Sequence, residues 1–321
     1  MSTFKEIRGK AIKSLASDPS PVVGGDIWYN STSQTLKGVV ALGAWSSGGA
    51  LSAGRYGLGG AGTQTAGLVF GGSPTTASTE EYDGSGWTAG GSLNNARFAL
   101  GGAGTQTSAL AMSGRGPSWS TTLTEKYDGS SWTNSTASPT ALNQVTTTGT
   151  QTAALLWGGV PSPGAPGTTG TSEFDGSSWA SGGSLPSNQE KAGAFGTQTA
   201  AMSAGNRDGT TLFYDGSSWS DQSAPIPYSA PVYFRYAGTM GTQTAGVIAG
   251  GEPGYSTTSA IWDGTAWGSN PSLATGRNNG ATGPIGNSTA GIVAGGSIAP
   301  GVTTATEEYT LADTTKTFTT S

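Results

Sequence analysis

The sequence predicts an all-β fold, a six-bladed β-propeller with four-stranded blades, and three observations support this. The motif Gly-Thr-Gln-Thr begins at residues 62, 104, 149, 196 and 241, and a degenerate sixth copy, Gly-Asn-Ser-Thr, begins at residue 286. The steps between copies are 42, 45, 47, 45 and 45 residues, and no helix-like stretch interrupts them. An Asp-Gly turn followed by a Trp accompanies each of the first five copies. A period of about 45 residues built from short strands is typical of a closed array of small sheets.

The composition sets limits on function. The chain has 321 residues, 55 of them glycine, and only 10% are charged. Such a composition also occurs in disordered sequences, but here ten Trp and ten Tyr can fill cores. There is no Cys and no His, which excludes disulfides, thiolate or imidazole metal sites, and Ser-His-Asp or Cys-His catalysis. The net charge of −5 argues against nucleic-acid binding. We therefore expect no cofactor, no metal and no nucleic-acid partner.

The first residues predict a short amphipathic helix. Phe4, Ile7 and Ile12 have roughly helical spacing among basic residues that include Arg8, although Gly9 weakens the pattern. Charges stand where a secretion signal needs an apolar core, so we expect no classical signal peptide. No apolar run approaches the roughly 18 residues of a membrane-spanning helix, so we expect no membrane insertion.

A β-hairpin is expected next. Residues 18–21, Asp-Pro-Ser-Pro, end any helix and are typical of a linker. Residues 25–37 then contain an aromatic strand with Trp28 and Tyr29, a polar turn and a return strand. We assign residues 1–38 to an N-terminal module and residues 39–321 to the propeller.

The opening sequence resembles the N-termini of tail-fibre-like structural proteins of marine bacteriophages. The resemblance covers roughly residues 3–38, including TFKEIRG at residues 3–9 and IWYN at residues 27–30. It implies a virion attachment module that precedes a variable C-terminal domain, with other virion proteins as its partners. The residues expected to dock are Phe4, Ile7, Arg8, Ile12, Trp28 and Tyr29. The resemblance also implies a protein made in the host cytoplasm and located on the virion exterior, and phage fibres are often homotrimers. A small β-domain without a special role is the alternative.

Each repeat is predicted to contain four strands. In the second copy, residues 97–103 are small enough for an innermost strand, and residues 108–114 form an apolar strand buried on both faces. Residues 124–127 alternate as a third strand, Asp128-Gly129 makes the hairpin turn, and Trp132 begins the outermost strand. We interpret the recurring Trp as packing between neighbouring sheets rather than binding a ligand.

Glycine pairs end the second strand in four copies, at residues 71, 158, 250 and 295. Gly-Gly followed by Tyr and then Trp resembles the kelch repeat over residues 46–310, although the Tyr-to-Trp spacing of five is short for that family. The Asp-Gly-Ser-Ser-Trp turn also resembles a shortened Asp-box of sialidases. Both resemblances imply a propeller.

The sixth copy lacks its own outer turn and Trp, ending at residues 307–311. The sequence around Trp45 parallels the outer strand around Trp87, so Val39–Trp45 is predicted to complete the sixth blade and hide its edge. The tail at Lys316–Phe318 is the competing candidate for this place.

The two faces of the predicted propeller differ. One carries the near-identical Gly-Thr-Gln-Thr and Asp-Gly turns. The other, called the variable face, carries the loop after each second strand and the loop before each inner strand, which differ in every copy. Recognition is usually located on such loops. The loops after the second strands are residues 73–78, 115–122, 160–171, 206–210, 252–256 and 297–303.

Arginine and aromatic residues on the variable face suit anionic or neutral sugars. The candidate ligand-binding residues are Arg55, Arg97, Arg115, Trp119, Arg207, Tyr233, Arg235, Tyr255 and Arg277. The alternative is that each Arg pairs with a nearby carboxylate and only seals the ring.

The sequence favours a non-enzymatic, tail-fibre-like virion protein that presents a propeller face to a host-surface glycan or protein. A capsid head fibre or decoration protein is the first alternative. A glycan hydrolase would need two carboxylates about 5–9.5 Å apart, and acidic residues are scarce on the variable loops, with Glu190, Asp208 and Glu252 the main ones. An intracellular kelch adaptor is the third alternative.

Overall fold

The computed structural model describes residues 12–21, 26–206, 209–226, 234, 237–252, 254–281 and 283–318. Within these ranges the chain is all-β, without an assigned helix. It divides into two units, one formed by Met1–Ala44 with Leu311–Ser321 and the other by Trp45–Thr310. The larger unit contains the repeats.

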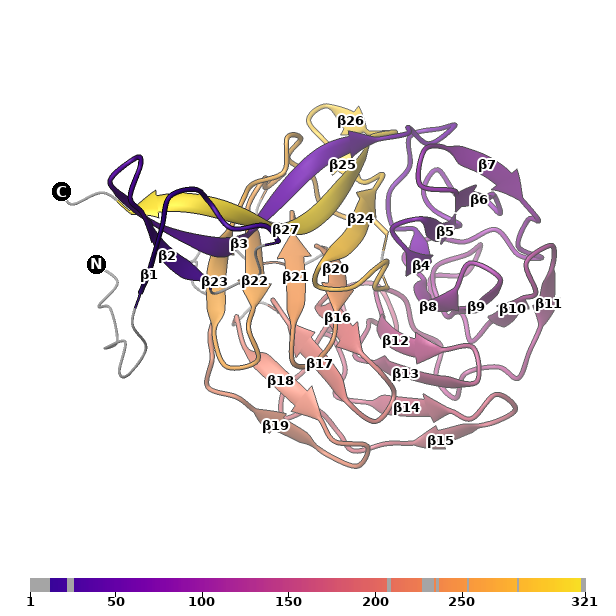
Figure 1. The fold of residues 1–321 in the computed structure, drawn as a ribbon. Coiled ribbons are helices and arrows are strands. Elements are labelled where there is room, and N and C mark those ends of the chain that lie inside the picture. The colour runs from indigo at the N-terminus through magenta and orange to yellow at the C-terminus, as the bar shows by residue number, and fades with distance from the viewer. Residues whose placement is uncertain are drawn as a thin grey trace. The chain divides into compact units, whose positions relative to one another are not determined.

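Five antiparallel sheets of four strands follow one another along the larger unit (Figure 1). The first is β4 (Gly59–Thr63), β5 (Ala66–Phe70), β6 (Thr79–Tyr82) and β7 (Trp87–Gly90). The second is β8 (Gly101–Thr105), β9 (Ser108–Met112), β10 (Thr124–Tyr127) and β11 (Trp132–Asn134). The third is β12 (Thr146–Thr150), β13 (Ala153–Trp157), β14 (Thr171–Phe174) and β15 (Trp179–Ser181). The fourth is β16 (Gly193–Gly196), β17 (Ala201–Ala204), β18 (Thr211–Tyr214) and β19 (Trp219–Asp221). The fifth is β20 (Gly238–Gly241), β21 (Gly246–Ala249), β22 (Ser259–Trp262) and β23 (Trp267–Asn270).

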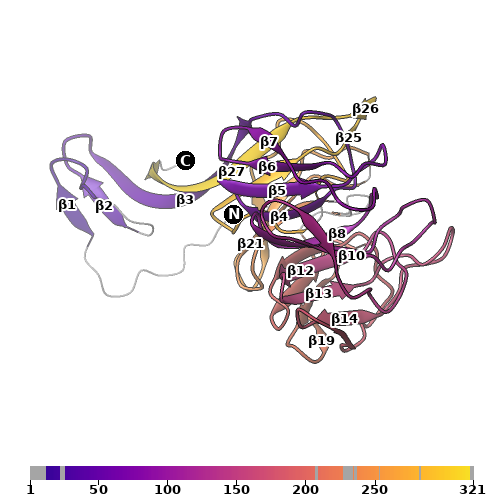
Figure 2. The same ribbon diagram turned by 90° about the vertical axis from the view of Figure 1, so that its right-hand side faces the viewer.

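A sixth sheet contains β24 (Ala290–Ala294), β27 (Thr306–Phe318) and β3 (Thr35–Gly48) as neighbours. The innermost strands of the first five sheets contact one another in turn, β4 with β8, then β12, β16 and β20, and β24, which follows the sixth inner turn, contacts both β20 and β4. Figure 2 shows the strands of the first sheet lying side by side. This repeated arrangement of four-stranded sheets is that of a β-propeller. A small hairpin, β25 (Ser297–Ile298) and β26 (Gly301–Val302), extends one variable loop.

The inner strands approach so closely that side chains are excluded. A Cβ atom added to Gly102 would lie 2.3 Å from the carbonyl oxygen of Gly60 in the neighbouring sheet, and one added to Gly101 would lie 2.3 Å from the Thr147 side chain. The predicted crowding of the innermost strand is therefore confirmed. The strand begins at Gly101 rather than at Arg97, because Ala99 has a φ of 52° and interrupts the extended backbone.

The outer hairpins follow the prediction. Tyr127 pairs with Trp132 across the Asp128 turn, and their ring centroids lie 4.9 Å apart. The Trp132 indole Nε1–H donates to Thr79 Oγ1 of the preceding sheet at 2.9 Å. Trp132 is buried and packs with Phe70 of that sheet. The interpretation of this Trp as packing between sheets is thus confirmed.

Asp128 holds its turn by accepting three short hydrogen bonds on one oxygen. The donors are the Ser130 and Ser131 backbone N–H groups, at 2.9 and 2.8 Å, and the Ser130 hydroxyl, at 2.8 Å. These bonds, that from the Ser131 N–H first, lower the pKa of Asp128 to about 2. The same turn recurs at Asp83, Asp175, Asp215 and Asp263. The near identity of these turns therefore has a structural explanation.

The glutamine of each Gly-Thr-Gln-Thr motif joins two sheets. The Gln151 amide donates to the carbonyl oxygens of Ala109 and Tyr127 in the preceding sheet, at 3.0 and 2.6 Å. Equivalent bonds are made by Gln64, Gln106, Gln198 and Gln243. We call these bonds the Gln clamps. Since a turn alone does not require Gln, the clamps account for its repetition.

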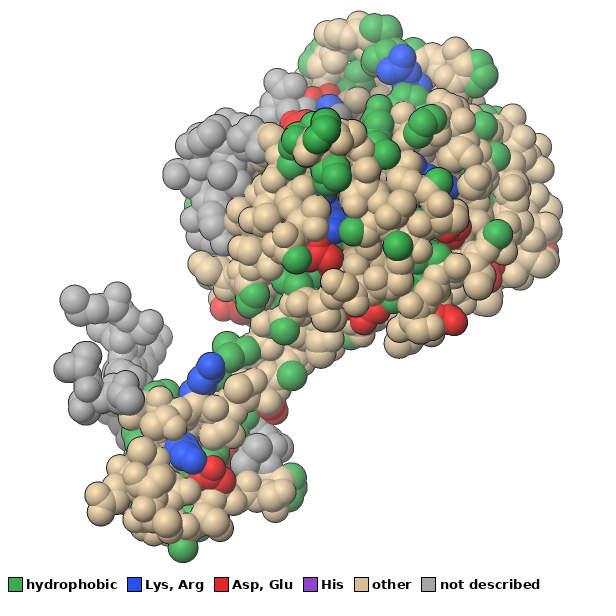
Figure 3. Space-filling model, turned by 90° about the horizontal axis from the view of Figure 1, so that it is seen from above, with side chains coloured by type: hydrophobic (Ala, Val, Ile, Leu, Met, Phe, Trp, Pro, Cys, Tyr) green, Lys and Arg blue, Asp and Glu red, His purple; other side chains and the backbone are tan. Residues whose placement is uncertain are grey.

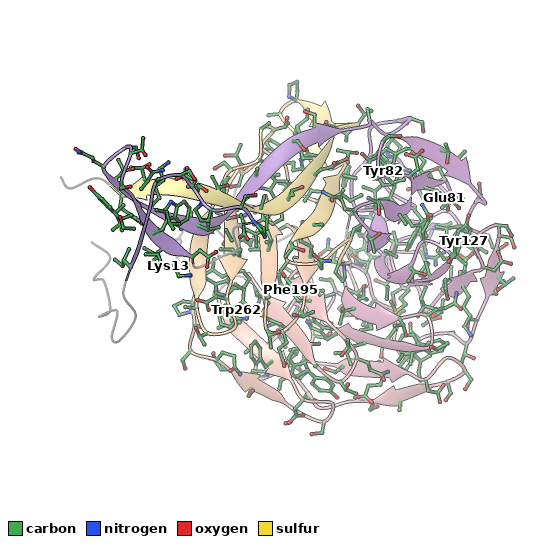
Figure 4. The ribbon with its side chains drawn as sticks, viewed as in Figure 1. Lys13, Glu81, Tyr82, Tyr127, Phe195 and Trp262 are labelled. Atoms are coloured by element: carbon green, nitrogen blue, oxygen red, sulfur yellow. The ribbon has the colours of Figure 1, made fainter. Side chains whose placement is uncertain are left out.

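A tyrosine–glutamate bond joins neighbouring sheets at the third strand. Tyr127 donates its hydroxyl to Glu81, and Tyr82 likewise to Glu308. Tyr82, Glu81 and Tyr127 are labelled in Figure 4. Where the third sheet has Phe174 in place of Tyr, the second sheet has Lys126, whose ammonium lies 5.5 Å from the Phe174 ring centroid. At this junction a cation over an aromatic ring replaces the tyrosine–glutamate bond.

The sixth sheet takes its outer strand from the start of the chain. Trp45, in β3, lies 5.1 Å from Tyr309, in β27, between ring centroids, as Trp132 lies from Tyr127. Its Nε1–H donates to the Pro271 carbonyl oxygen at 2.9 Å. Of the segment expected to close the ring, Val39–Trp45, only Trp45 belongs to the larger unit. Trp45–Gly48 therefore supplies the outer strand.

The smaller unit contains the short strands β1 (Lys13–Leu15) and β2 (Ile27–Asn30), the first part of β3 and the last part of β27. The tail at Lys316–Phe318, the competing candidate for closing the ring, lies in this last part of β27 and does not supply the outer strand of the sixth sheet. β1 pairs with β2 in parallel, and β2 pairs with β3 as the expected hairpin. Most of the expected amphipathic helix, including Phe4, Ile7 and Arg8, lies outside the described residues. At its end, residues 13–15 form strand rather than helix, because they hydrogen-bond to the aromatic strand at residues 28–30.

Candidate functional site

Three of the candidate arginines are buried. Arg55, Arg97 and Arg277 are 3%, 0% and 1% exposed. Arg97 forms an ion pair with Glu125, and its guanidinium also donates to the Ser113 carbonyl oxygen at 3.0 Å. Burial lowers the pKa of the Arg97 guanidinium, and the Glu125 carboxylate opposes this effect. These arginines present no surface to a ligand.

The same ion pair recurs in the first and sixth sheets. Arg55 lies 2.5 Å from Glu80, and Arg277 lies 2.6 Å from Glu307, between nitrogen and oxygen. The other oxygen of each carboxylate accepts a backbone N–H from the loop before the inner strand, such as that of Ser52. The structure thus gives Arg55, Arg97 and Arg277 the sealing role described by the alternative, because their charge is consumed inside each sheet.

The inner strands leave little space between them at one place in the described part of the chain. A cavity of about 10 Å³ remains between the inner strands, lined by residues that include Thr147, Thr239 and Gly283. This volume is barely enough for one water molecule. A cavity of this size does not admit a small-molecule ligand.

A chain of backbone hydrogen bonds caps the axis on the variable face. Gly57, Ala99, Gln144, Lys191 and Asn279 occupy matching positions, each with φ between 52° and 65°. The N–H of Ala99 donates to Gly57 at 2.7 Å, that of Gln144 to Ala99 at 2.8 Å, and that of Lys191 to Gln144 at 3.1 Å. Left-handed backbone costs about 1–2 kcal/mol for a non-glycine residue, and these bonds offset that cost.

A partly exposed aromatic patch lies on the variable face beside the first and second sheets. We define it as Tyr56, Phe98, Arg115 and Trp119. The Arg115 guanidinium carbon lies 3.8 Å from the Trp119 ring centroid and 5.4 Å from that of Phe98, and Phe98 contacts Tyr56 edge-on at 6.2 Å. Within the described residues no carboxylate pairs with Arg115. Its charge is therefore held on aromatic rings and remains available to a partner.

The aromatic patch is held by backbone pairing. Phe98 and Arg115 exchange hydrogen bonds of 2.9 and 2.7 Å, and Asn143 donates its amide to the Trp119 carbonyl oxygen at 3.2 Å. Arg115 and Trp119 were predicted from the sequence, whereas Tyr56 and Phe98 were not. Their positions next to Arg55 and Arg97 were the available signal.

The remaining candidates are separate. Tyr255 is 44% exposed on another loop of the variable face. Arg207, Tyr233 and Arg235 lie outside the described residues. Of the six candidates that the structure describes, it brings together only Arg115 and Trp119.

A pocket of about 430 Å³ opens on the variable face beside the third and fourth sheets. It is lined by residues 164–167, Asn188, Glu190 and Asn206. From the sequence, Glu190 was only one of the few acidic residues on the variable loops, and the pocket was not predicted. In the described residues no cluster of three or more acidic groups could hold a metal ion.

In the smaller unit, the two aromatic docking candidates differ. Trp28 is 2% exposed and donates its indole N–H to Asp18 at 3.0 Å, so it belongs to the core of this unit. Asp18 also pairs with Lys37 at 2.7 Å. Tyr29 is 38% exposed and Ile12 is 43% exposed. Only these two of the described candidates can contact a partner.

Charged side chains are sparse on the face displayed in Figure 3, where uncharged polar groups and backbone predominate. No helix in the described ranges has the length and apolar character to cross a membrane.

Comparisons with known proteins support the fold. No protein-family model matches the sequence, and no curated protein matches it. Among solved structures, that of YjhT matches with a TM-score of 0.69 and 16% sequence identity, covering 83% of this chain and 99% of YjhT. At this identity the similarity shows the fold alone. The chain is a β-propeller protein.

Proposed function

We propose that this chain is a non-enzymatic virion protein, similar to a tail fibre, that presents the variable face of a six-bladed, kelch-like propeller to a host surface. The observation that carries the proposal is the difference between the two faces. The side chains of the repeated turns and of the three buried arginines make hydrogen bonds and ion pairs within and between sheets. Arg115 and the aromatic rings beside it remain partly exposed. A rigid scaffold with one variable, partly apolar face suits recognition.

The six-bladed count rests on the sixth sheet. β24 and β27 pair antiparallel, and β3 adds Trp45 where the other sheets have their outer Trp. A blade with strands from both ends of the chain closes the ring and leaves no unpaired edge strand between its first and last blades.

The docking role of the N-terminal module has support in its surface. Four of the six exposed large hydrophobic side chains in the described residues lie in the smaller unit: Ile12, Ile27, Tyr29 and Leu42. Exposed apolar groups on so small a unit favour contact with another protein. The phage-like sequence of residues 3–38 makes other virion proteins the proposed partners.

Labelling of intact virions with a gold-conjugated antibody against the propeller tests the proposal. Label at the tail tip or fibres supports host recognition. Label on the capsid favours the head-fibre or decoration alternative, and no label on any virion contradicts a virion role.

A competition experiment tests the aromatic patch. Excess purified protein should slow virion adsorption to host cells, and the Arg115→Ala, Trp119→Ala double variant should compete at least about tenfold less well, the equivalent of about 1.4 kcal/mol. Thr133→Ala, on an outer strand, is the matched control. Equal competition by all three proteins would exclude the patch as the contact surface.

A further inference from the structure

Arg115 carries the positive charge of the aromatic patch, and the protein makes no polar use of its guanidinium. The three other arginines that the structure describes are each ion-paired to a glutamate. Arg115 is partly exposed and makes no ion pair and no side-chain hydrogen bond with any described residue. Its guanidinium lies against the rings of Trp119 and Phe98 instead. The five N–H donors of a guanidinium are therefore available to a ligand here.

The fold does not require an arginine at this position. The backbone bridge between Arg115 and Phe98 recurs in other sheets. The residues in the place of Arg115 are Ser73, Val160 and Ser297. A small hydroxyl or aliphatic side chain therefore suits the same backbone geometry. Trp119 is equally specific to the second sheet, because none of the other loops after a second strand contains a Trp.

We propose that the aromatic patch binds the carboxylate of an acidic sugar, such as a hexuronic acid residue of a glycan. A guanidinium and a carboxylate are both planar and pair through two parallel hydrogen bonds. The contact with Trp119 and the backbone bridge to Phe98 hold Arg115 in place before binding, which reduces the entropy lost when the ligand arrives. The rings of Tyr56 and Phe98, 6.2 Å apart between centroids, offer apolar surface to the C–H groups of the sugar.

A small ligand with a single negative charge fits the patch better than a polyanion or a protein. The chain has a net charge of −5, so it does not attract polyanions at long range and binding depends on Arg115 itself. A stable protein interface takes about 20–30 residues from each side, whereas four residues form the patch. Of the exposed large hydrophobic side chains in the described residues, only Tyr255 and Val302 lie in the larger unit. The patch is therefore not part of a broad apolar surface.

This inference deepens the proposed function, since it names the ligand class of the aromatic patch, and it rests on that proposal only for the place of the ligand on a host surface. The two fail separately, because sugar binding is measured with the purified chain and the virion role by antibody labelling. A chain that labels virions but binds no acidic sugar would refute this inference alone.

The test compares ligands that differ in charge. The full chain is first applied to an array of glycans that contain hexuronic or sialic acids, neutral glycans and sulfated glycans, with poly-L-glutamate as a carboxylate without sugar. Calorimetry then compares the acidic glycan bound most tightly with its methyl ester, which has lost the charge but keeps the sugar ring. We expect the acid to bind at least about tenfold more tightly than the ester. Equal binding of acid and ester, no binding of any acidic glycan, or a preference for sulfated glycans or poly-L-glutamate would each overturn the proposal.

Variants locate the site. Arg115→Ser introduces the residue that the first sheet has at the same bridge, so the fold should tolerate it. This variant should bind the acidic glycan at least about tenfold less tightly and should no longer distinguish the acid from its ester. Ser297→Ala, at the equivalent bridge of the sixth sheet, is the matched control and should bind as the parent does, and thermal unfolding verifies that both variants are folded. An unchanged preference for the acid in folded Arg115→Ser would overturn this site.

Discussion

Arg97 and Glu125 are both fully buried, so each charge depends on the other. Removing one partner of a buried ion pair leaves an uncompensated charge and typically costs about 3–5 kcal/mol, whereas replacing both with uncharged groups is often neutral. The chain already contains an uncharged alternative to this ion pair, because the third sheet has Leu142 and Ser172 at these two positions. The three sheets that keep the Arg also keep the Glu.

Glu125→Ser should therefore lower the free energy of unfolding by about 3–5 kcal/mol, because Arg97 stays buried. The double variant Arg97→Leu, Glu125→Ser should recover most of this loss. Chemical denaturation of the three proteins measures both effects. A single variant within about 1 kcal/mol of the parent would contradict a structural role for the pair.

Tyr82, Tyr127 and Tyr214 make stability depend on alkaline pH. Burial, followed by a hydrogen bond to a glutamate, raises the pKa of each from 10.0 to about 12. Because the folded state holds these protons more tightly, the stabilisation is complete below pH 10 and is lost as the pH rises to about 12. Urea midpoints should fall across this range.

The absorbance of tyrosinate provides the direct measurement. Part of the signal should titrate late in the folded protein, and Tyr127→Phe should reduce that late fraction. Tyr255→Phe, at an exposed position, is the matched control. Titration of all tyrosines together near pH 10 in the folded state would refute the assignment.

At the scale of elements, the Gln clamps recur at equivalent positions of the repeats. Five copies have the Gln, whereas the sixth has Ser288 at this position. The carbonyl groups of Gly246 and Trp262 in the fifth sheet match those that Gln151 binds in the second. A Gln at residue 288 could therefore form the missing clamp.

Gln151→Ser should cost about 1–3 kcal/mol, since it removes two hydrogen bonds of about 0.5–1.5 kcal/mol each. Ser288→Gln should change stability in the opposite direction. Unfolding midpoints of the two variants and of their combination give the comparison. If Gln151→Ser lowers stability but Ser288→Gln does not raise it, a Gln at the sixth turn does not form the clamp.

The elements were largely predictable, because their signals are local. Asp128 and Gly129 specify a tight turn by their own conformational preferences, and Trp132 marks the strand that follows. The cap of left-handed residues was not predictable, because Gly57, Ala99, Gln144 and Lys191 share no side-chain property. Their conformation comes from hydrogen bonds between sheets, which no local pattern encodes.

At the scale of the whole molecule, the propeller fold could be predicted, but the site could not. The period near 45 residues and the outer Trp without a blade of its own indicated a ring. The arginines were interpreted from their position at the loops, yet their burial depends on the glutamates 25 to 30 residues away. The pocket at Asn206 is formed by loops of two sheets, so the sequence of a single segment does not predict it.

Closure of the ring depends on four residues near the start of the chain. Trp45–Gly48 supplies the outer strand of the sixth sheet, whereas residues 1–44 belong to the smaller unit. Deletion of residues 1–44 should therefore leave the unfolding midpoint of the propeller nearly unchanged. Deletion of residues 1–48 should lower it, because β27 then exposes an unpaired edge and Tyr309 loses its ring partner.

The two deletions differ by only four residues, so differences in expression or length cannot explain a large effect. Thermal unfolding monitored by tryptophan fluorescence measures the midpoint, and size-exclusion chromatography detects association through the open edge. Trp45→Ala in the full chain should fall between the two deletions, because it removes the contact of 5.1 Å with Tyr309 but keeps the strand. Equal midpoints for the two deletions would mean that the sixth sheet does not need its outer strand.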